Sequence, residues 1–126
     1  MKQHEEALAD AIRAIELEPD NARYYDSRGV TLHEMKRYEE ALTDKAKAIE
    51  LDPNNALYYQ SRGVTLRAMK QYDEALKDAD KSIKLAPENA LYYESRSKTY
   101  REMGENEKAE RDLKKAEELR EKGNKE

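Results

Sequence analysis

The chain has 126 residues, of which 41% are charged and 37% hydrophobic, and its formal net charge is −4. This length fits one domain with a modest core, and the interspersed charges of both signs argue against a nucleic-acid or membrane surface. The absence of cysteine excludes a disulfide framework and a thiolate metal site. Because no long apolar run and no secretory signal is visible, we expect a soluble, cytoplasmic protein.

One phrase recurs along the chain at an interval of 34 residues. It reads YYDSRGVTL from Tyr24, YYQSRGVTL from Tyr58 and YYESRSKTY from Tyr92. Three prolines share the same interval: Pro19, Pro53 and Pro87. A fixed period of this length predicts one repeated structural unit rather than several domains.

Apolar residues at helical spacing predict about seven helices. In chain order they cover residues 4–18, 22–36, 38–52, 56–70, 72–86, 90–103 and 106–122. Asn21, Asn55 and Asn89 stand just before the helix that opens each unit, where a side-chain oxygen can cap free backbone N–H groups. The prolines end the helices that close the units, because proline lacks an N–H and disfavours helix in the residue before it. Short loops make consecutive helices antiparallel neighbours.

Two glycines, Gly29 and Gly63, lie inside predicted helices, where glycine costs about 1 kcal/mol relative to alanine. This cost is explained if a neighbouring helix must approach closely, with Ala41 and Ala75 supplying the opposite surface. Ser97, also small, takes the same position in the third unit. The alternative interpretation is a flexible hinge.

Taken together, these features resemble the tetratricopeptide repeat, a 34-residue helix–turn–helix unit. The residues that carry the resemblance are Tyr25, Gly29, Leu32, Tyr38, Ala41, Ala48 and Pro53, then Tyr59, Gly63, Leu66, Tyr72, Ala75, Ser82 and Pro87, then Tyr93, Ser97, Tyr100, Ala109 and Ala116. The resemblance implies an all-α fold, an α-solenoid built as a right-handed superhelical stack of antiparallel helix pairs. It divides the single domain 1–126 into a half repeat (1–21) and three full repeats (22–55, 56–89 and 90–123), the last helix acting as a C-terminal cap.

The chain also departs from the family pattern. Tyrosine replaces the usual tryptophan, and the bulky residue expected in the second helix is replaced by Ala11, Lys45 and Ala79. We expect the space so created to be filled by the tyrosines that open the recurring phrase: Tyr24, Tyr58 and Tyr92.

Arginines and aspartates recur on the same period in opposite helices of each unit. The arginines are Arg28, Arg62 and Arg96, and the aspartates are Asp10, Asp44, Asp78 and Asp112. Their spacing predicts a ladder of ion pairs between helices. The alternative is that the arginines bind a carboxylate or phosphate of a ligand.

The two ends of the array differ. Glu117 stands where the other second helices place Ile15, Ile49 and Ile83, which predicts a polar outer face for the last helix. Met1 aligns with Met35, Met69 and Met103, so we expect the first helix of the first unit to be missing and part of the Leu8 and Ile15 face to lack an internal partner. That face then continues into a longer array or binds another molecule.

In the family, the concave surface is lined by the first helix of each pair. Carried over to this chain, the groove consists of Arg23, Asp26, Ser27, Val30, His33, Leu57, Gln60, Ser61, Val64, Arg67, Leu91, Glu94, Ser95, Lys98 and Arg101. Leu57, Val64 and Leu91 form an apolar strip, and Arg67, Lys98 and Arg101 make one side basic. We therefore expect a protein or peptide partner with apolar anchors and an acidic end.

No catalytic, metal or cofactor site is predicted. His4 and His33 lie in different units, and Ser27, Ser61 and Ser95 recur, whereas a nucleophile is normally single and paired with a base. Ser61 and Leu91 replace an asparagine and a lysine that family members use to grip the C-terminal carboxylate of chaperones, so a co-chaperone role is not expected. One alternative is a self-assembling or designed structural module that forms homo-oligomers through Leu8 and Ile15. A helical-repeat RNA binder is less consistent with the acidic balance.

Overall fold

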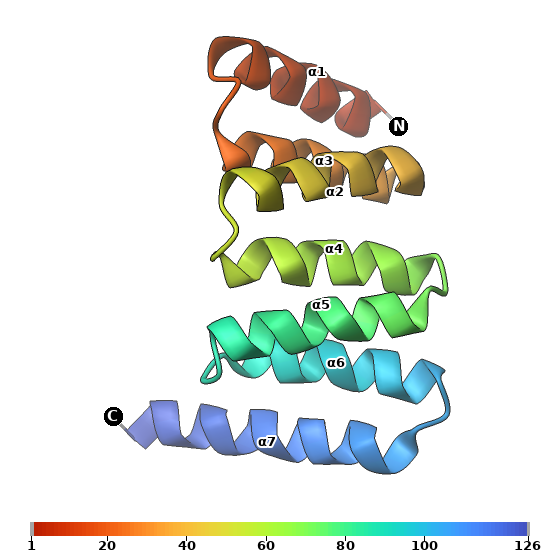
Figure 1. The fold of residues 1–126 in the computed structure, drawn as a ribbon, viewed down its shortest axis with the longest axis vertical. Coiled ribbons are helices and arrows are strands. Elements are labelled where there is room, and N and C mark those ends of the chain that lie inside the picture. Colours follow the sequence, from red (N-terminus) through yellow and green to blue (C-terminus); the bar gives the residue numbers. More distant parts are fainter. Residues whose placement is uncertain (1, 126) are drawn as a thin grey trace.

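The computed structural model describes residues 2–125, which form seven α-helices and no strand (Figure 1). The helices are α1 (Lys2–Leu17), α2 (Ala22–Glu34), α3 (Tyr38–Leu51), α4 (Ala56–Ala68), α5 (Tyr72–Leu85), α6 (Ala90–Glu102) and α7 (Asn106–Lys125). The predicted all-α fold is confirmed, although α7 continues past its predicted end at residue 122. Met1 lies outside the described residues. In the described range no helix is both long and apolar enough to cross a membrane.

Each repeat begins with the same asparagine cap. The side chains of Asn21, Asn55 and Asn89 accept hydrogen bonds of 3.0 Å from backbone N–H groups two residues later. At the other end of the turn, the hydroxyls of Tyr25, Tyr59 and Tyr93 donate to the carbonyls of Pro19, Pro53 and Pro87. The repeated tyrosines and prolines therefore close the inter-repeat loop, and they fix the direction in which each new helix pair starts.

The helices stack in pairs, with α2 against α3, α4 against α5 and α6 against α7, while α1 packs on α2 (Figure 1). The first helices also touch along the array, since α2 contacts α4 and α4 contacts α6. Among residues 2–125 the second helices α3, α5 and α7 make no comparable contact with one another. The stack therefore curves toward α2, α4 and α6, which form its concave side.

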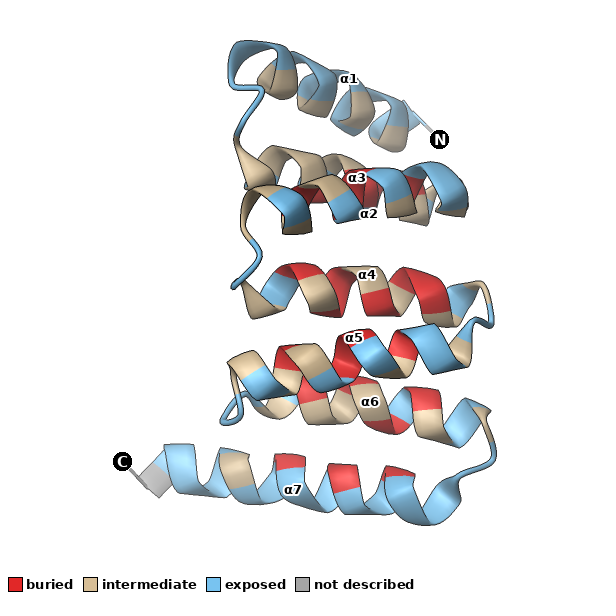
Figure 2. Ribbon diagram, in the orientation of Figure 1, coloured by how far each residue is buried: buried red, intermediate tan, exposed pale blue. Residues whose placement is uncertain are grey.

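Small residues let the paired helices approach closely. Figure 2 shows buried residues in red on α2 to α7 and none on α1. Ala41, Ala48, Ala75, Ala109 and Ala116 are almost fully buried. A Cβ added to Gly29 would lie 2.8 Å from Lys45 Cγ, and one added to Gly63 would lie 3.3 Å from Asp78 Cβ. Both glycines lie inside continuous helices, so neither is a hinge, and the helices approach most closely at Gly29.

The predicted ladder of ion pairs is confirmed within all three full repeats. Arg28 pairs with Asp44, Arg62 with Asp78 and Arg96 with Asp112, each through two hydrogen bonds of 2.7–2.8 Å. The carboxylates are buried and the arginines are partly buried. Asp10, the fourth aspartate of the series, is exposed on α1 and forms no such pair in the described part of the chain.

The three tyrosines that open the repeated phrase are not equivalent. Tyr58 and Tyr92 are buried, as expected for side chains that fill the space between repeats. Tyr24 is only partly buried, and its hydroxyl donates to Glu18 instead.

Candidate binding groove

All fifteen residues predicted to line a groove belong to the concave-side helices α2, α4 and α6, but they are buried to different extents. Seven are exposed: Arg23, Ser27, Val30, Leu57, Leu91, Lys98 and Arg101. Four are partly exposed: His33, Val64, Arg67 and Glu94. Four are buried: Asp26, Gln60, Ser61 and Ser95. The accessible surface is therefore smaller than the predicted set, and the buried members form the floor beneath it.

The floor between the first two full repeats contains a polar network that the sequence interpretation missed. Lys45 of α3 is only 2% exposed, and its ammonium donates to the carbonyl of Ser61 at 2.8 Å and to the hydroxyl of Thr65 at 2.7 Å. The Thr65 hydroxyl also lies 2.8 Å from His33 Nδ1. Because that hydroxyl accepts from Lys45, its own proton is free to go to a neutral His33. The sequence did contain a signal for this network, because Lys45 is a charged residue at a position that the repeat pattern assigns to the core.

The floor between the second and third full repeats uses a different cation for the same purpose. Ala79 stands where the preceding repeat has Lys45, so no ammonium reaches this interface from the second helix. Arg67, the counterpart of His33, instead donates to the carbonyl of Ser95 at 3.0 Å. A basic side chain thus donates to the equivalent carbonyl at both interfaces. Lys45 reaches the Ser61 carbonyl from the second helix of its repeat, and Arg67 reaches the Ser95 carbonyl from the first helix of its repeat.

Burial controls the charge states in this floor. It lowers the pKa of Lys45 to about 8. It raises the pKa of Asp26, an effect that the nearby Ser61 hydroxyl and the Lys45 charge oppose. The pKa of His33 is lowered, first by burial and then by the positive charge of Lys45. Two buried atoms, Asp26 Oδ1 and Ser61 Oγ, have no hydrogen-bond partner within the described residues.

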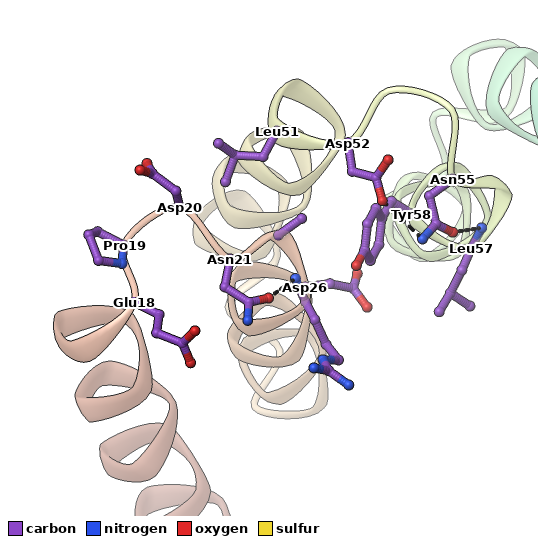
Figure 3. Close-up of a pocket in the computed structure, with 12 residues that line it drawn as sticks. Glu18, Pro19, Asp20, Asn21, Asp26, Leu51, Asp52, Asn55, Leu57 and Tyr58 are labelled. Atoms are coloured by element: carbon purple, nitrogen blue, oxygen red, sulfur yellow. Dashed lines mark hydrogen bonds between the residues drawn. The ribbon is translucent and has the colours of Figure 1, made fainter.

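A pocket of about 890 Å³ opens at the end of the groove where α2 and α4 begin. Figure 3 shows Asp26 of α2 and Tyr58 of α4 pointing toward each other across it, with Glu18 and Asp20 on one loop and Asp52 on the next. Leu51 and Leu57 add apolar surface, and Arg23 completes the charged lining. Three of the predicted groove residues, Arg23, Asp26 and Leu57, therefore meet here.

The surface of α1 is only partly covered. Leu8 and Ile15, predicted as a self-association face, are both partly buried, whereas Ile12 and Leu17 are exposed. Leu8 and Ile12 line a second pocket, of about 360 Å³, together with Arg28 and Leu32 of α2. The large apolar residues exposed on α1 are thus Ile12 and Leu17.

Within the described residues no hydrogen bond joins Ser27, Ser61 or Ser95 to a histidine. The Ser95 hydroxyl lies 3.3 Å from Arg67, Ser27 is exposed, and His33 contacts a threonine. Within residues 2–125 no three side chains of the metal-binding types gather closely enough to hold a metal ion.

Family models described as "Tetratricopeptide repeat" match residues 22–55, 46–77 and 90–122. A search of curated proteins found no match. Among solved structures, a crystal structure of MamA is 24% identical and has a TM-score of 0.87, over 98% of this chain and 72% of that chain. MamA from Desulfovibrio magneticus is 19% identical, with a TM-score of 0.86, over 96% of this chain and 68% of that chain. These likenesses establish the fold.

Proposed function

The chain belongs to the tetratricopeptide repeat family, and from this premise we propose that it is a non-catalytic scaffold of the cytoplasm that binds a peptide or helix of a partner protein in its concave groove. The main supporting observation is the exposure of apolar side chains on that side. Leu57 and Leu91 are 49% and 50% exposed at equivalent positions of α4 and α6, and Val30 is exposed on α2. Leucines left in water on the concave side of a repeat array are suited to bury against a ligand.

The groove also suggests what the ligand carries. Its apolar anchors would contact Leu57 and Leu91, with Val64, two turns further along α4, as a partly exposed neighbour. Its acidic end would lie near Lys98 and Arg101, whose side chains are exposed. Arg67 contributes less than its sequence position suggested, because it already donates to Ser95 and lies 3.6 Å from Glu102.

This function can be tested by selecting peptides from a random displayed library and mapping the tightest binder by amide NMR shifts. We expect shifts on α2, α4 and α6, and at least a tenfold loss of affinity for Leu57→Asp or Leu91→Asp. The matched control is Leu113→Asp, because Leu113 is exposed on α7, away from the concave side. Equal losses for all three variants, or shifts confined to α3, α5 and α7, would contradict groove binding.

A second candidate function is self-assembly through α1. It is favoured by the exposure of Ile12 and Leu17 and by the pocket that Leu8 helps to line. Light scattering over a hundredfold range of concentration tests it: assembly predicts a mass that rises from 14.7 kDa in steps. An Ile12→Glu variant should then remain monomeric, whereas a constant mass for the unaltered chain would exclude this function.

A further inference from the structure

The pocket where α2 and α4 begin is strongly acidic. Its lining includes four carboxylates and one guanidinium: Glu18, Asp20, Asp26, Asp52 and Arg23. The positions 34 residues later carry one carboxylate and no guanidinium: Asp52, Asn54, Gln60, Ala86 and Leu57. The capping asparagine and the buried tyrosine are the same in both repeats. The repeat therefore folds without this charge, and the fold does not explain it.

Asp26 is the least expected of these carboxylates. It is buried at a position where the next repeat has the neutral Gln60, and its Oδ1 has no hydrogen-bond partner within residues 2–125. The donor nearest to it is the Ser61 hydroxyl, which also has no other partner within those residues. Glu18 and Asp52 differ from Asp26, since Tyr24 donates to Glu18 and Asn55 donates to Asp52. Asp26 is thus a pocket carboxylate to which Tyr and Asn side chains do not donate, and its oxygen open to a ligand is Oδ2, because Oδ1 is buried.

The pocket carboxylates also affect the pKa of Tyr58. Burial raises the pKa of Tyr58, the negative charges of Asp26 and Asp52 raise it further, and the positive charge of Arg23 opposes them. The pKa of its counterpart Tyr92 is raised by burial alone. Two tyrosines in the same place of the repeat therefore experience different potentials, and the potential in the first pocket is negative.

The form of the pocket favours an organic cation over a metal ion. The carboxylates are spread around the wall of a pocket of about 890 Å³, and within the described residues they form no group able to hold a metal ion. Leu57 is half exposed beside them, so an aliphatic stem could bury against it. A lysine or arginine side chain combines an aliphatic stem with a charged donor.

We propose that this pocket binds a cationic group of the ligand peptide, either a lysine or arginine side chain or a free N-terminal ammonium, and that Asp26 is its principal acceptor. The proposal rests on the peptide-binding function above and adds a direction to it. The basic end of the ligand lies over α2 and α4, its apolar part crosses Leu57 and Leu91, and its acidic end lies over Lys98 and Arg101. Opposite charges at the two ends of the groove select one orientation of the ligand.

Three pentapeptides test the proposal by NMR titration of the whole chain. The first is acetyl-Gly-Leu-Lys-Leu-Gly-amide, the second replaces its lysine by norleucine, and the third is Gly-Leu-norleucine-Leu-Gly-amide with a free N-terminus. We expect the lysine peptide or the free-amine peptide to shift the amides of Asp26, Leu57 and Tyr58 at millimolar concentration, and to bind at least about tenfold more tightly than the neutral peptide. Which of the two binds identifies the source of the cation.

Asp26→Gln makes this position like its counterpart Gln60 and should remove that preference, about a tenfold effect. Asp20→Asn combined with Asp52→Ala reduces the negative charge of the pocket without altering the buried hydrogen bonds of Lys45. This double variant should weaken binding of the cationic peptides but not of the neutral peptide. Asp73→Asn, an exposed change on α5, is the control for net charge and should have no effect. Moderate salt should weaken binding of the cationic peptides to the unaltered chain.

The outcomes separate this proposal from the function on which it rests. If all three peptides shift the groove equally and Asp26→Gln changes nothing, the cation pocket is wrong and groove binding stands. If displayed peptides bind but none of the pentapeptides shifts Asp26, Leu57 or Tyr58, the cation pocket is again wrong. If neither displayed peptides nor pentapeptides shift α2, α4 or α6, both proposals fail.

Discussion

The ammonium of Lys45 donates a hydrogen bond of 2.7 Å to the hydroxyl of Thr65, which joins the second helix of one repeat to the first helix of the next. Lys45 also donates to the carbonyl of Ser61 on the same helix, α4. A lysine buried to this extent is uncommon, since desolvation disfavours the charged form. The pair has consequences that can be measured in unfolding experiments.

The first prediction concerns stability at alkaline pH. The pKa of Lys45 is about 8 in the folded chain and 10.5 for an ordinary lysine. Between these values the unfolded state binds more protons, so the free energy of unfolding rises with pH. Urea unfolding should show a gain of roughly 2 kcal/mol from pH 7.5 to 9.5, and Lys45→Met should abolish it. An unchanged slope in the variant would show that Lys45 is solvated. The raised pKa values of Tyr58 and Tyr92 act in the opposite direction, but only near pH 10 and above.

The second prediction concerns Thr65 itself. Thr65→Val keeps the shape but leaves Lys45 with one acceptor and His33 without its hydroxyl neighbour, so we expect a loss of about 2 kcal/mol. Thr99→Val is the matched control, because Thr99 is equally buried and makes only a 3.5 Å contact with the carbonyl of Ser95. Thermal unfolding of both variants measures the difference. Equal losses would mean that the network contributes nothing beyond packing.

A third prediction uses the two carboxylates that contact Arg96. The Asp112 side chain is 6% exposed and forms two hydrogen bonds with Arg96, whereas the Asp80 side chain is 62% exposed and forms one. Asp112→Asn should lower the free energy of unfolding by roughly 3 kcal/mol, because it removes the negative charge of an ion pair that is shielded from water. Asp80→Asn should cost under about 1 kcal/mol. Chemical denaturation compares them, and a larger loss for Asp80→Asn would refute the buried ladder.

The fourth prediction separates the two helical glycines. In Gly63→Ala the new Cβ would lie 3.3 Å from Asp78 Cβ and 3.5 Å from the Ala75 carbonyl, a contact that small shifts relieve. The gain in helix propensity, about 1 kcal/mol, should make this variant at least as stable as the unaltered chain. In Gly29→Ala the Cβ would lie 2.8 Å from Lys45 Cγ, whose side chain is held at its far end, so a net loss is expected. Urea midpoints of the two variants give the order.

The fifth prediction concerns the turn inside each pair. Lys36 and Lys70 have φ of 63° and 62°, and the third repeat has Gly104 at 82° in the same place. This left-handed conformation disfavours residues with a Cβ. Lys70→Gly should therefore stabilise the chain by roughly 0.5–1 kcal/mol, and Gly104→Lys should destabilise it by a similar amount. If both changes destabilise, the lysine must contribute contacts of its own.

The features predicted correctly from the sequence are those set by local chemistry and by the period. Asn55 caps α4 because its side chain reaches an N–H group two residues away, which requires no distant partner. Arg62 and Asp78 meet because a 34-residue unit repeats one geometry, so the same spacing implies the same pair in every full repeat.

By itself, then, the sequence determined the helices, their pairing, the inter-helix ion pairs and the family. Only the tertiary structure decided which concave residues are exposed, that Lys45 is buried beneath them, and that Asp26 keeps a carboxylate oxygen without a partner. The reason is physical. Helix formation and capping depend on neighbours along the chain, whereas burial and pKa depend on side chains that converge from α2, α3 and α4, and no period specifies their combination at a single interface.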